Sequence, residues 1–211
     1  MSLPKISVNM TITPASVTLG VPCSITLVAT LSHPTPITIY TQRSVLNLPL
    51  AQTVRNFYCV DLSNNNDPVF LETRKCTKRA GGVRRELGGR DDQYFHTLEP
   101  EKPYEFIDRF ILSYGLNEPL VAGHRYRFGF SEKQTSPCWL DGTREDVLHL
   151  PGEHEGIDKE WAKGQIILDL GLPFGFDVLE AEDSVSQRDC VPNENENWKA
   201  HGGLGASGRV L

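Results

Sequence analysis

A short, glycine-rich stretch of the chain, residues 74–92, concentrates the side chains best suited to binding chemistry. They are Arg74, Lys75, Lys78, Arg79, Arg84, Arg85 and Arg90. Clustered positive charge attracts carboxylates and phosphates, so this stretch could dock an acidic protein, a phosphate group or a nucleic-acid backbone. Glu86, Asp91 and Asp92 neutralise part of the charge, and the stretch has no aromatic side chain on which a base could stack. We predict a mobile surface loop, with two alternatives open: a solvated loop that resists aggregation, or a loop that docks a protein partner.

The glycines, histidines, cysteines and serines do not have the spacing of a phosphate-binding, metal-binding or catalytic motif. The glycine pairs at 81–82 and 88–89 are not followed by the Lys-Ser/Thr of a phosphate-binding loop. Among the histidines only His149 and His154 are close in sequence, and a proline between them prevents a helical metal-binding pair. Cys138 lacks a catalytic-cysteine signature, and no Gly-x-Ser-x-Gly motif occurs. We therefore predict no catalytic residue, no metal site and no cofactor, which favours a non-enzymatic protein.

The elements that must carry these residues are predicted to be strands. Apolar and polar residues alternate over 6–12, 23–31 and 124–130, which is typical of strands with one buried face. Further strands are predicted at 37–42, 57–62, 69–73, 93–98, 104–112, 166–170 and 174–179. Short strands at close spacing, separated by Gly and Pro turns, are typical of an antiparallel β-sandwich.

The domain organisation follows from where this alternation weakens. We predict one mostly β domain over residues 1–179, with long loops and an irregular extension at 131–165. Within that extension, Thr143 and Asp146 have the spacing of a capping box and predict one helical turn. Residues 180–211 are polar and glycine-rich without an apolar period, so we predict a disordered tail.

Two segments resemble the start of strands in immunoglobulin-like sandwiches. Residues 97–104 resemble the pattern L-x-P-G-x-x-Y, with Glu101 in place of the glycine, and residues 120–128 resemble L-x-x-G-x-Y-x-F, with one additional residue before Tyr126. The order of the elements also resembles small intracellular proteinase-inhibitor domains of the BsuPI type. The whole chain, particularly 91–95 and 124–129, is similar to a group of uncharacterised fungal cytosolic proteins, a resemblance that implies no activity.

Composition limits the class of protein and its partners. A hydrophobic fraction of 39% is ordinary for a globular core, and a net charge of −6 argues against nucleic acid as the main partner. The five cysteines are an odd number and are widely spaced, so we predict reduced thiols. The first residues lack a signal peptide, and no apolar run is long enough to span a bilayer. These features predict a cytoplasmic protein without a membrane segment, with the nucleus left open.

The leading functional hypothesis is a protein-interaction module that uses its sheet edges and the loop at 74–92. One alternative is a small-molecule-binding protein or an enzyme, with a pocket between the sandwich and the segment at 139–161. A second alternative, an intracellular protease inhibitor, is implied by resemblance alone. The sequence identifies neither the partner nor the oligomeric state.

Overall fold

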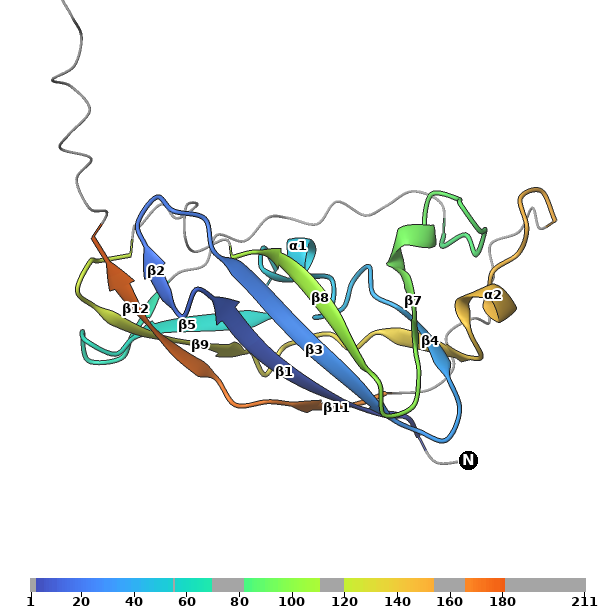
Figure 1. Cartoon of the computed structure of the whole chain (residues 1–211), viewed down its shortest axis with the longest axis horizontal. Coiled ribbons are helices and arrows are strands. Elements are labelled where there is room, and N and C mark those ends of the chain that lie inside the picture. Colours follow the sequence, from blue (N-terminus) through green and yellow to red (C-terminus); the bar gives the residue numbers. More distant parts are fainter. Residues whose placement is uncertain (1–2, 55, 70–81, 111–119, 154–165, 181–211) are drawn as a thin grey trace, which may run out of the picture. The chain divides into compact units, whose positions relative to one another are not determined.

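The computed structural model describes residues 3–54, 56–69, 82–110, 120–153 and 166–180, and strands are the main regular elements among them (Figure 1). The strands are β1 (Lys5–Thr13), β2 (Ser16–Thr18), β3 (Ser24–Ser32), β4 (Ile37–Tyr40), β5 (Phe57–Asp61), β6 (Asp67–Val69), β7 (Phe95–Leu98), β8 (Pro103–Arg109), β9 (Arg125–Phe130), β10 (Cys138–Asp141), β11 (Ile167–Leu170) and β12 (Phe174–Leu179). Two short helices, α1 (Leu48–Ala51) and α2 (Arg144–Val147), and a 3-10 turn at Asp92–Tyr94 accompany them.

The first sheet has the order β11-β1-β3-β8. β1 and β3 are antiparallel, with Ile6 opposite Leu31 and Met10 opposite Leu27, and β8 continues the antiparallel order beyond β3. Every second residue of β1 and β3 is buried, because a strand turns successive side chains to opposite faces. The strands predicted at 6–12 and 23–31 are therefore confirmed.

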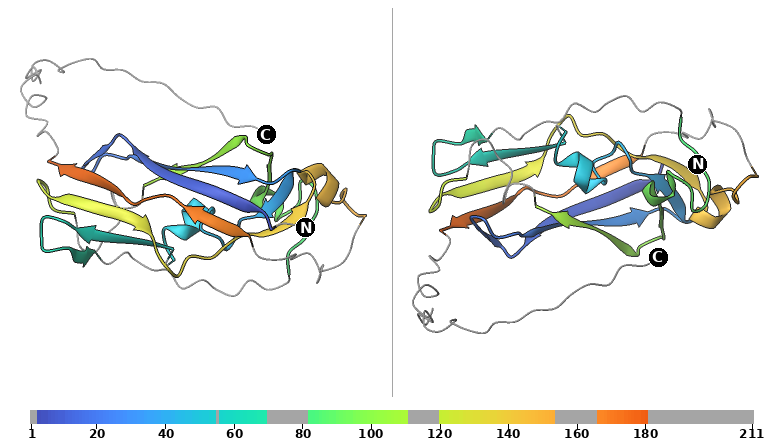
Figure 2. Two further views of the ribbon diagram at one scale, coloured as in Figure 1. Left: turned by 90° about the horizontal axis from the view of Figure 1, so that it is seen from below. Right: turned by 90° about the horizontal axis from the view of Figure 1, so that it is seen from above.

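The second sheet has the order β2-β12-β9-β5-β6 and lies under the first as a separate layer (Figure 2). β9 is antiparallel to both β5 and β12, and β5 and β6 form a hairpin. The predicted strands at 57–62, 124–130 and 174–179 are confirmed. The strand predicted at 69–73 overlaps β6 only at Val69, and its other residues lie outside the described ones.

The connections between the two layers define an immunoglobulin-like sandwich. β3 and β8 lie in one sheet, β5 and β9 lie in the other, and the chain crosses between the layers after β3 and again after β8. The first and last segments of the fold also change layers: β1 pairs in parallel with β11, and β2 pairs in parallel with β12. The predicted fold class, a mostly β immunoglobulin-like sandwich, is confirmed by these pairings.

Aromatic residues fill the space between the layers. Four of them are at most 2% exposed: Phe110, Tyr126, Phe128 and Phe176. The Phe128 ring centre lies 5.0 Å from that of Phe110 and 5.1 Å from that of Phe57. Burying each such side chain contributes roughly 1.5–3 kcal/mol, so this cluster is a main source of the stability of the sandwich.

A third, small sheet with the order β10-β4-β7 lies at one end of the sandwich, and it corrects one prediction. Residues 131–165 were predicted to be irregular apart from one helical turn, yet the strand β10 also forms within them. In β10 the adjacent residues Trp139 and Leu140 are both buried, and all four residues of β4 are buried. A strand packed on both faces loses the two-residue alternation, which is why the sequence pattern weakened there.

Other predicted features have different outcomes. The helical turn with Thr143 and Asp146 is confirmed as α2, which begins with a capping box. Glu101, which takes the place of a glycine in the strand-start pattern, has φ 58°, a left-handed conformation that favours glycine.

The compact unit that contains the three sheets extends to residue 181. The tail predicted at 180–211 lies outside the described residues apart from Glu180, so it stays a prediction.

Candidate functional site

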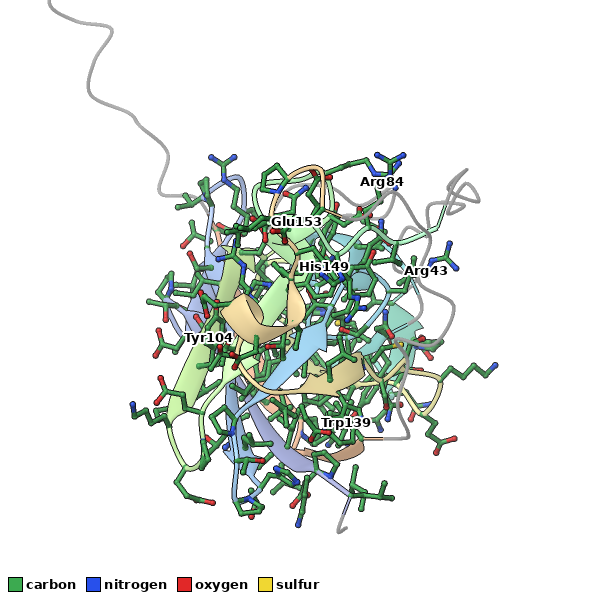
Figure 3. All side chains as sticks on the ribbon, turned by 90° about the vertical axis from the view of Figure 1, so that its right-hand side faces the viewer. Arg43, Arg84, Tyr104, Trp139, His149 and Glu153 are labelled. Carbon is green, nitrogen blue, oxygen red and sulfur yellow. The ribbon has the colours of Figure 1, made fainter. Side chains whose placement is uncertain are left out.

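The end of the molecule that carries the third sheet also carries the described part of the basic stretch, and Figure 3 looks directly onto it. A second, smaller apolar cluster holds this end together. It consists of Tyr40, Phe95, Leu140, Val147 and Leu148, with Val83, Leu87, Tyr94 and Cys138 packed around it. The cluster contains residues of β4, β7, β10, α2 and the segment at 82–94. These elements are therefore packed together at this end of the molecule.

An ion pair fixes α2 to the segment before β7. The Arg144 Nε donates to Asp92 Oδ1 at 2.9 Å, and Arg144 Nη2 donates to Asp92 Oδ2. The backbone N–H of Gly88 also donates to Asp92 Oδ2, at 2.8 Å. Burial alone would raise the pKa of Asp92, but these hydrogen bonds and the guanidinium charge outweigh it and hold the pKa below the ordinary value. Asp92 is therefore a charged anchor at neutral pH.

A pocket of ≈ 640 Å³, which we call the Arg144 pocket, lies between β7, β8 and α2. Its lining is Pro36, Asp92, Gln93, Phe95, His96, Thr97, Glu99, Tyr104, Thr143, Arg144 and Glu145. His96 Nδ1 is 2.9 Å from the Tyr104 hydroxyl, and the two rings meet edge to face at 5.4 Å. Burial, helped by the Arg144 charge, lowers the pKa of His96, so its imidazole is neutral at pH 7. The pocket thus combines a neutral imidazole, a phenol and an anchored ion pair.

A second hollow of ≈ 520 Å³, the Trp139 pocket, adjoins the first at Pro36 and Thr143. It is lined by His33, Pro34, Thr35, Pro36, Trp139, Asp141, Gly142, Thr143 and Asp146. The Trp139 ring meets the His33 ring edge to face at 6.2 Å, and its buried indole N–H has no hydrogen-bond partner among the described residues. This is the region in which the sequence alternative placed a ligand pocket. Trp161, which was expected to contribute, lies outside the described residues.

The basic stretch is only partly described, and its described part is held in place. Arg74, Lys75, Lys78 and Arg79 lie outside the described residues. Asp91 is fully buried and accepts hydrogen bonds from the Arg84 N–H at 2.9 Å and from Arg90 Nη2 at 3.3 Å. Residues 82–92 are therefore held by hydrogen bonds to a buried carboxylate, which gathers the polar groups of this segment around it. The mobility of the stretch stays a prediction.

The three described arginines of the stretch have different surroundings. Arg90 also donates to the Gly82 carbonyl at 3.0 Å, so its guanidinium serves the local structure. Arg85 is partly buried, which lowers its pKa, and its carbonyl accepts a hydrogen bond from the His149 N–H at 2.8 Å. The Arg84 side chain is exposed and makes no ion pair with a described residue. It projects on the same side of this end as Arg43 (Figure 3). Of the three, Arg84 is the one available to a partner.

The outer edge of β8 presents open backbone groups. β8 ends its sheet, and the N–H of Phe110, the residue after it, donates to the Cys23 carbonyl at 2.8 Å. Antiparallel hydrogen bonding alternates, so the backbone groups of Tyr104, Phe106 and Asp108 face β3. Those of Glu105 and Ile107 face outward and form no hydrogen bond with another described residue. The side chain of Ile107 is also 62% exposed.

A histidine–carboxylate pair lies at the far end of the sandwich. His124 Nδ1 is 2.7 Å from Asp61 Oδ2, and Asp61 Oδ1 accepts from the N–H groups of Ser63 and Asn64. Burial alone would raise the pKa of Asp61, but these hydrogen bonds and the nearby imidazole outweigh it and lower the pKa. Burial and the Asp61 charge raise the pKa of Cys59 to about 12, so the thiol beside this pair is protonated and unreactive. The pair fastens the loop after β5 to the start of β9.

The described residues form neither a metal-binding cluster nor a membrane-spanning helix. Within these ranges, no three His, Cys, Asp or Glu side chains come together in a way that could hold a metal ion. No helix in the described part of the chain has the length and apolarity needed to span a bilayer.

The sequence alternative placed a pocket in the region of the Trp139 pocket, but the Arg144 pocket and the Asp92–Arg144 pair were missed. The partners of that pair are 52 positions apart, and His96 and Tyr104 approach from different sheets. The capping box was a local signal for α2, but no local signal indicated which side chains α2 would meet.

No family model and no curated protein matches the chain. Among solved structures, the CARDB domain of a Pyrococcus furiosus protein, in complex with di-metal ions, is similar to this chain at 9% sequence identity. The alignment covers 86% of this chain and 98% of that one, with a TM-score of 0.29. A TM-score this low does not support a fold assignment, so the immunoglobulin-like assignment depends on the strand pairings alone. The resemblances to BsuPI-type domains and to fungal cytosolic proteins stay predictions.

Proposed function

We propose that this protein is a non-enzymatic interaction module that binds an extended segment of a partner protein along the outer edge of β8. The observation that carries the proposal is the outward-facing backbone of Glu105 and Ile107, unpaired within the described residues, at the end of the first sheet. A partner strand of about five residues would satisfy these groups by strand addition. Exposed Ile107 would gain an apolar neighbour on the outer face, where cross-strand pairs stabilise a sheet.

Features on both sides of this edge favour a selective partner over indiscriminate pairing. Pro103 has no N–H to offer, and the Gln52 side chain already donates to the Arg109 carbonyl at 2.8 Å. The exposed carboxylate of Glu105 lies between them. Proline and charge on an edge strand oppose pairing between identical edges, so the open stretch is short and bounded.

The proposal is tested by removing one N–H from the edge. Ile107→Pro deletes an outward-facing donor, whereas Ile107→Ala removes the side chain and keeps that donor. Affinity pull-downs from the protein's own cell extract, analysed quantitatively, should lose specific partners with Ile107→Pro and retain them with Ile107→Ala. Far-ultraviolet spectra and melting temperatures would establish that both variants are folded. Equal partner recovery by the folded Ile107→Pro variant would refute strand addition at β8.

The basic stretch supplies a second proposed contact with the same partner. Arg84 can pair with a partner carboxylate, and Arg74, Lys75, Lys78 and Arg79 would extend that contact. Arg84→Gln should slow association and reduce its dependence on salt, as expected for an exposed charge at the rim of an interface. Arg43→Gln, on the same side of this end, is the matched control because it removes the same charge outside the stretch. Equal effects of the two variants would argue against a specific role for the stretch.

A small-molecule-binding function is the second candidate, and the Trp139 pocket is the observation in its favour. That pocket combines an aromatic side chain, two prolines and the exposed Asp141 in ≈ 520 Å³, within the usual range for ligand sites. Quenching of tryptophan fluorescence by a metabolite panel, lost in Trp139→Phe, would support it. No geometry in the described residues supports the protease-inhibitor alternative. The proposal also includes a cytoplasmic location, which cell fractionation would test.

A further inference from the structure

We infer that the partner segment carries a lysine or arginine that enters the Arg144 pocket, beside the open edge of β8. This inference rests on the proposed function, because it requires the partner strand to be in place. The expected partner segment is an extended peptide with one basic side chain on the face that points toward the pocket.

Tyr104 shows that the Arg144 pocket lies beside the open edge of β8. This residue lines the Arg144 pocket and immediately precedes Glu105, where the open edge begins. In a sheet, directly opposed residues on neighbouring strands turn their side chains to the same face. A partner residue opposite Tyr104 therefore points to the Tyr104 face, toward the pocket. Residues opposite Glu105 and Ile107 point to the other face and remain outside it.

The charge of the pocket favours a basic side chain. Three carboxylates, Asp92, Glu99 and Glu145, and one guanidinium, Arg144, line it. Glu99 also pairs with Lys102, so with that lysine included and His96 neutral the net charge is −1, and Glu145 carries the uncompensated charge. Arg144 is engaged in its two hydrogen bonds to Asp92, so it offers little to an anionic ligand. Glu145 is exposed and has no ion-pair partner among the described residues. An acidic side chain in this pocket would meet repulsion, whereas a lysine or arginine would gain a partner.

The aromatic wall of the pocket provides a second reason for a cation. Tyr104 and His96 are fixed to each other by the hydroxyl–imidazole hydrogen bond, and Phe106 packs against both rings. An ammonium or guanidinium group beside the face of a tyrosine ring is attracted by its electron density. The long aliphatic stem of lysine or arginine would lie against these rings, as such stems do on apolar surfaces.

The test is a selection from a phage-displayed library of random seven-residue peptides on the immobilised full chain. Selected peptides are expected to carry Lys or Arg at one fixed position among β-forming residues, and binding is expected to be lost with Ile107→Pro. Affinity is then measured by fluorescence polarisation for one selected peptide and for its Lys→Met version. Glu145→Gln should weaken binding of the lysine peptide about fivefold, as expected for a partly exposed ion pair. It should leave binding of the methionine version unchanged.

Asp141→Asn is the matched control. It removes one exposed carboxylate from the same end of the molecule, but from the lining of the Trp139 pocket alone. It should change neither affinity. Selected peptides that require the β8 edge but show no basic preference would overturn this inference and leave the proposed function standing. The same holds for an equal loss in Glu145→Gln and Asp141→Asn. Recovery of no peptide, or binding unaffected by Ile107→Pro, would overturn both.

Discussion

The Asp92–Arg144 pair gives a quantitative test of how firmly α2 is attached to the rest of the molecule. Two hydrogen bonds to a charged partner contribute about 1.5–3 kcal/mol each when water is excluded. Here the Arg144 side chain is 34% exposed and the Asp92 side chain 14%, so solvent screens part of the attraction. Fully exposed pairs contribute only about 0.2–1 kcal/mol. We expect a coupling free energy between these limits, about 1–2 kcal/mol.

A double-mutant cycle with Asp92→Asn, Arg144→Gln and the double variant measures this coupling by urea unfolding at pH 7. The exposed pair Lys5–Asp169, whose side chains are 51% and 56% exposed at a separation of 2.8 Å, is the matched control and should give little coupling. Because the pKa of Asp92 is lowered in the folded state, the coupling should be complete above the ordinary carboxyl pKa. It should disappear as the pH falls through the lowered value. A coupling at pH 7 within the ~0.3–0.5 kcal/mol scatter of independent sites would refute the idea that this pair anchors α2.

Four further outcomes are expected. Because the folded-state pKa of Asp61 is lowered, its stabilising contribution should persist above the ordinary carboxyl value of about 3.9 and be lost below it, and Asp61→Asn should flatten that part of the stability–pH curve measured by urea unfolding. Phe128→Ala should lower the free energy of unfolding by about 3–5 kcal/mol, because the side chain is 1% exposed; a loss below about 1 kcal/mol would contradict its place in the core. Glu101→Gly should raise the free energy of unfolding by about 0.5–1 kcal/mol, because the residue has φ 58°, and no gain would indicate that the turn rearranges. Cys59, with a pKa of about 12, should resist alkylation at pH 8 in the native protein and react once the protein is unfolded, as mapped by peptide mass spectrometry.

The sandwich itself was predictable because its strands bury one face and expose the other. Ile25 and Leu27 in β3, and Tyr126 and Phe128 in β9, alternate with more exposed residues, and this two-residue rhythm is visible without any knowledge of the partner strand. The capping box at Thr143 and Asp146 was also readable, since it is a contact between residues three positions apart.

The candidate site was not predictable for the opposite reason. Trp139 and Leu140 are adjacent and both buried, so the pattern of β10 does not distinguish it from irregular structure. The Arg144 pocket is formed by residues from β7, β8 and α2, which approach one another only when the third sheet forms. The buried charge of Asp91 could not be inferred from a run of arginines, although it determines which of those arginines is available to a partner.

The parallel pairing of the first and last strand segments has a mechanical consequence. β1 beside β11 and β2 beside β12 connect the two chain ends of the sandwich through neighbouring strands that run in the same direction. A tensile load applied between residues 5 and 179 would slide these strands along each other, so their hydrogen bonds resist in shear and must rupture together. Strands loaded perpendicular to their length would instead unzip one bond at a time. Stretching between residues 5 and 179 should therefore require more force than peeling the same strands apart.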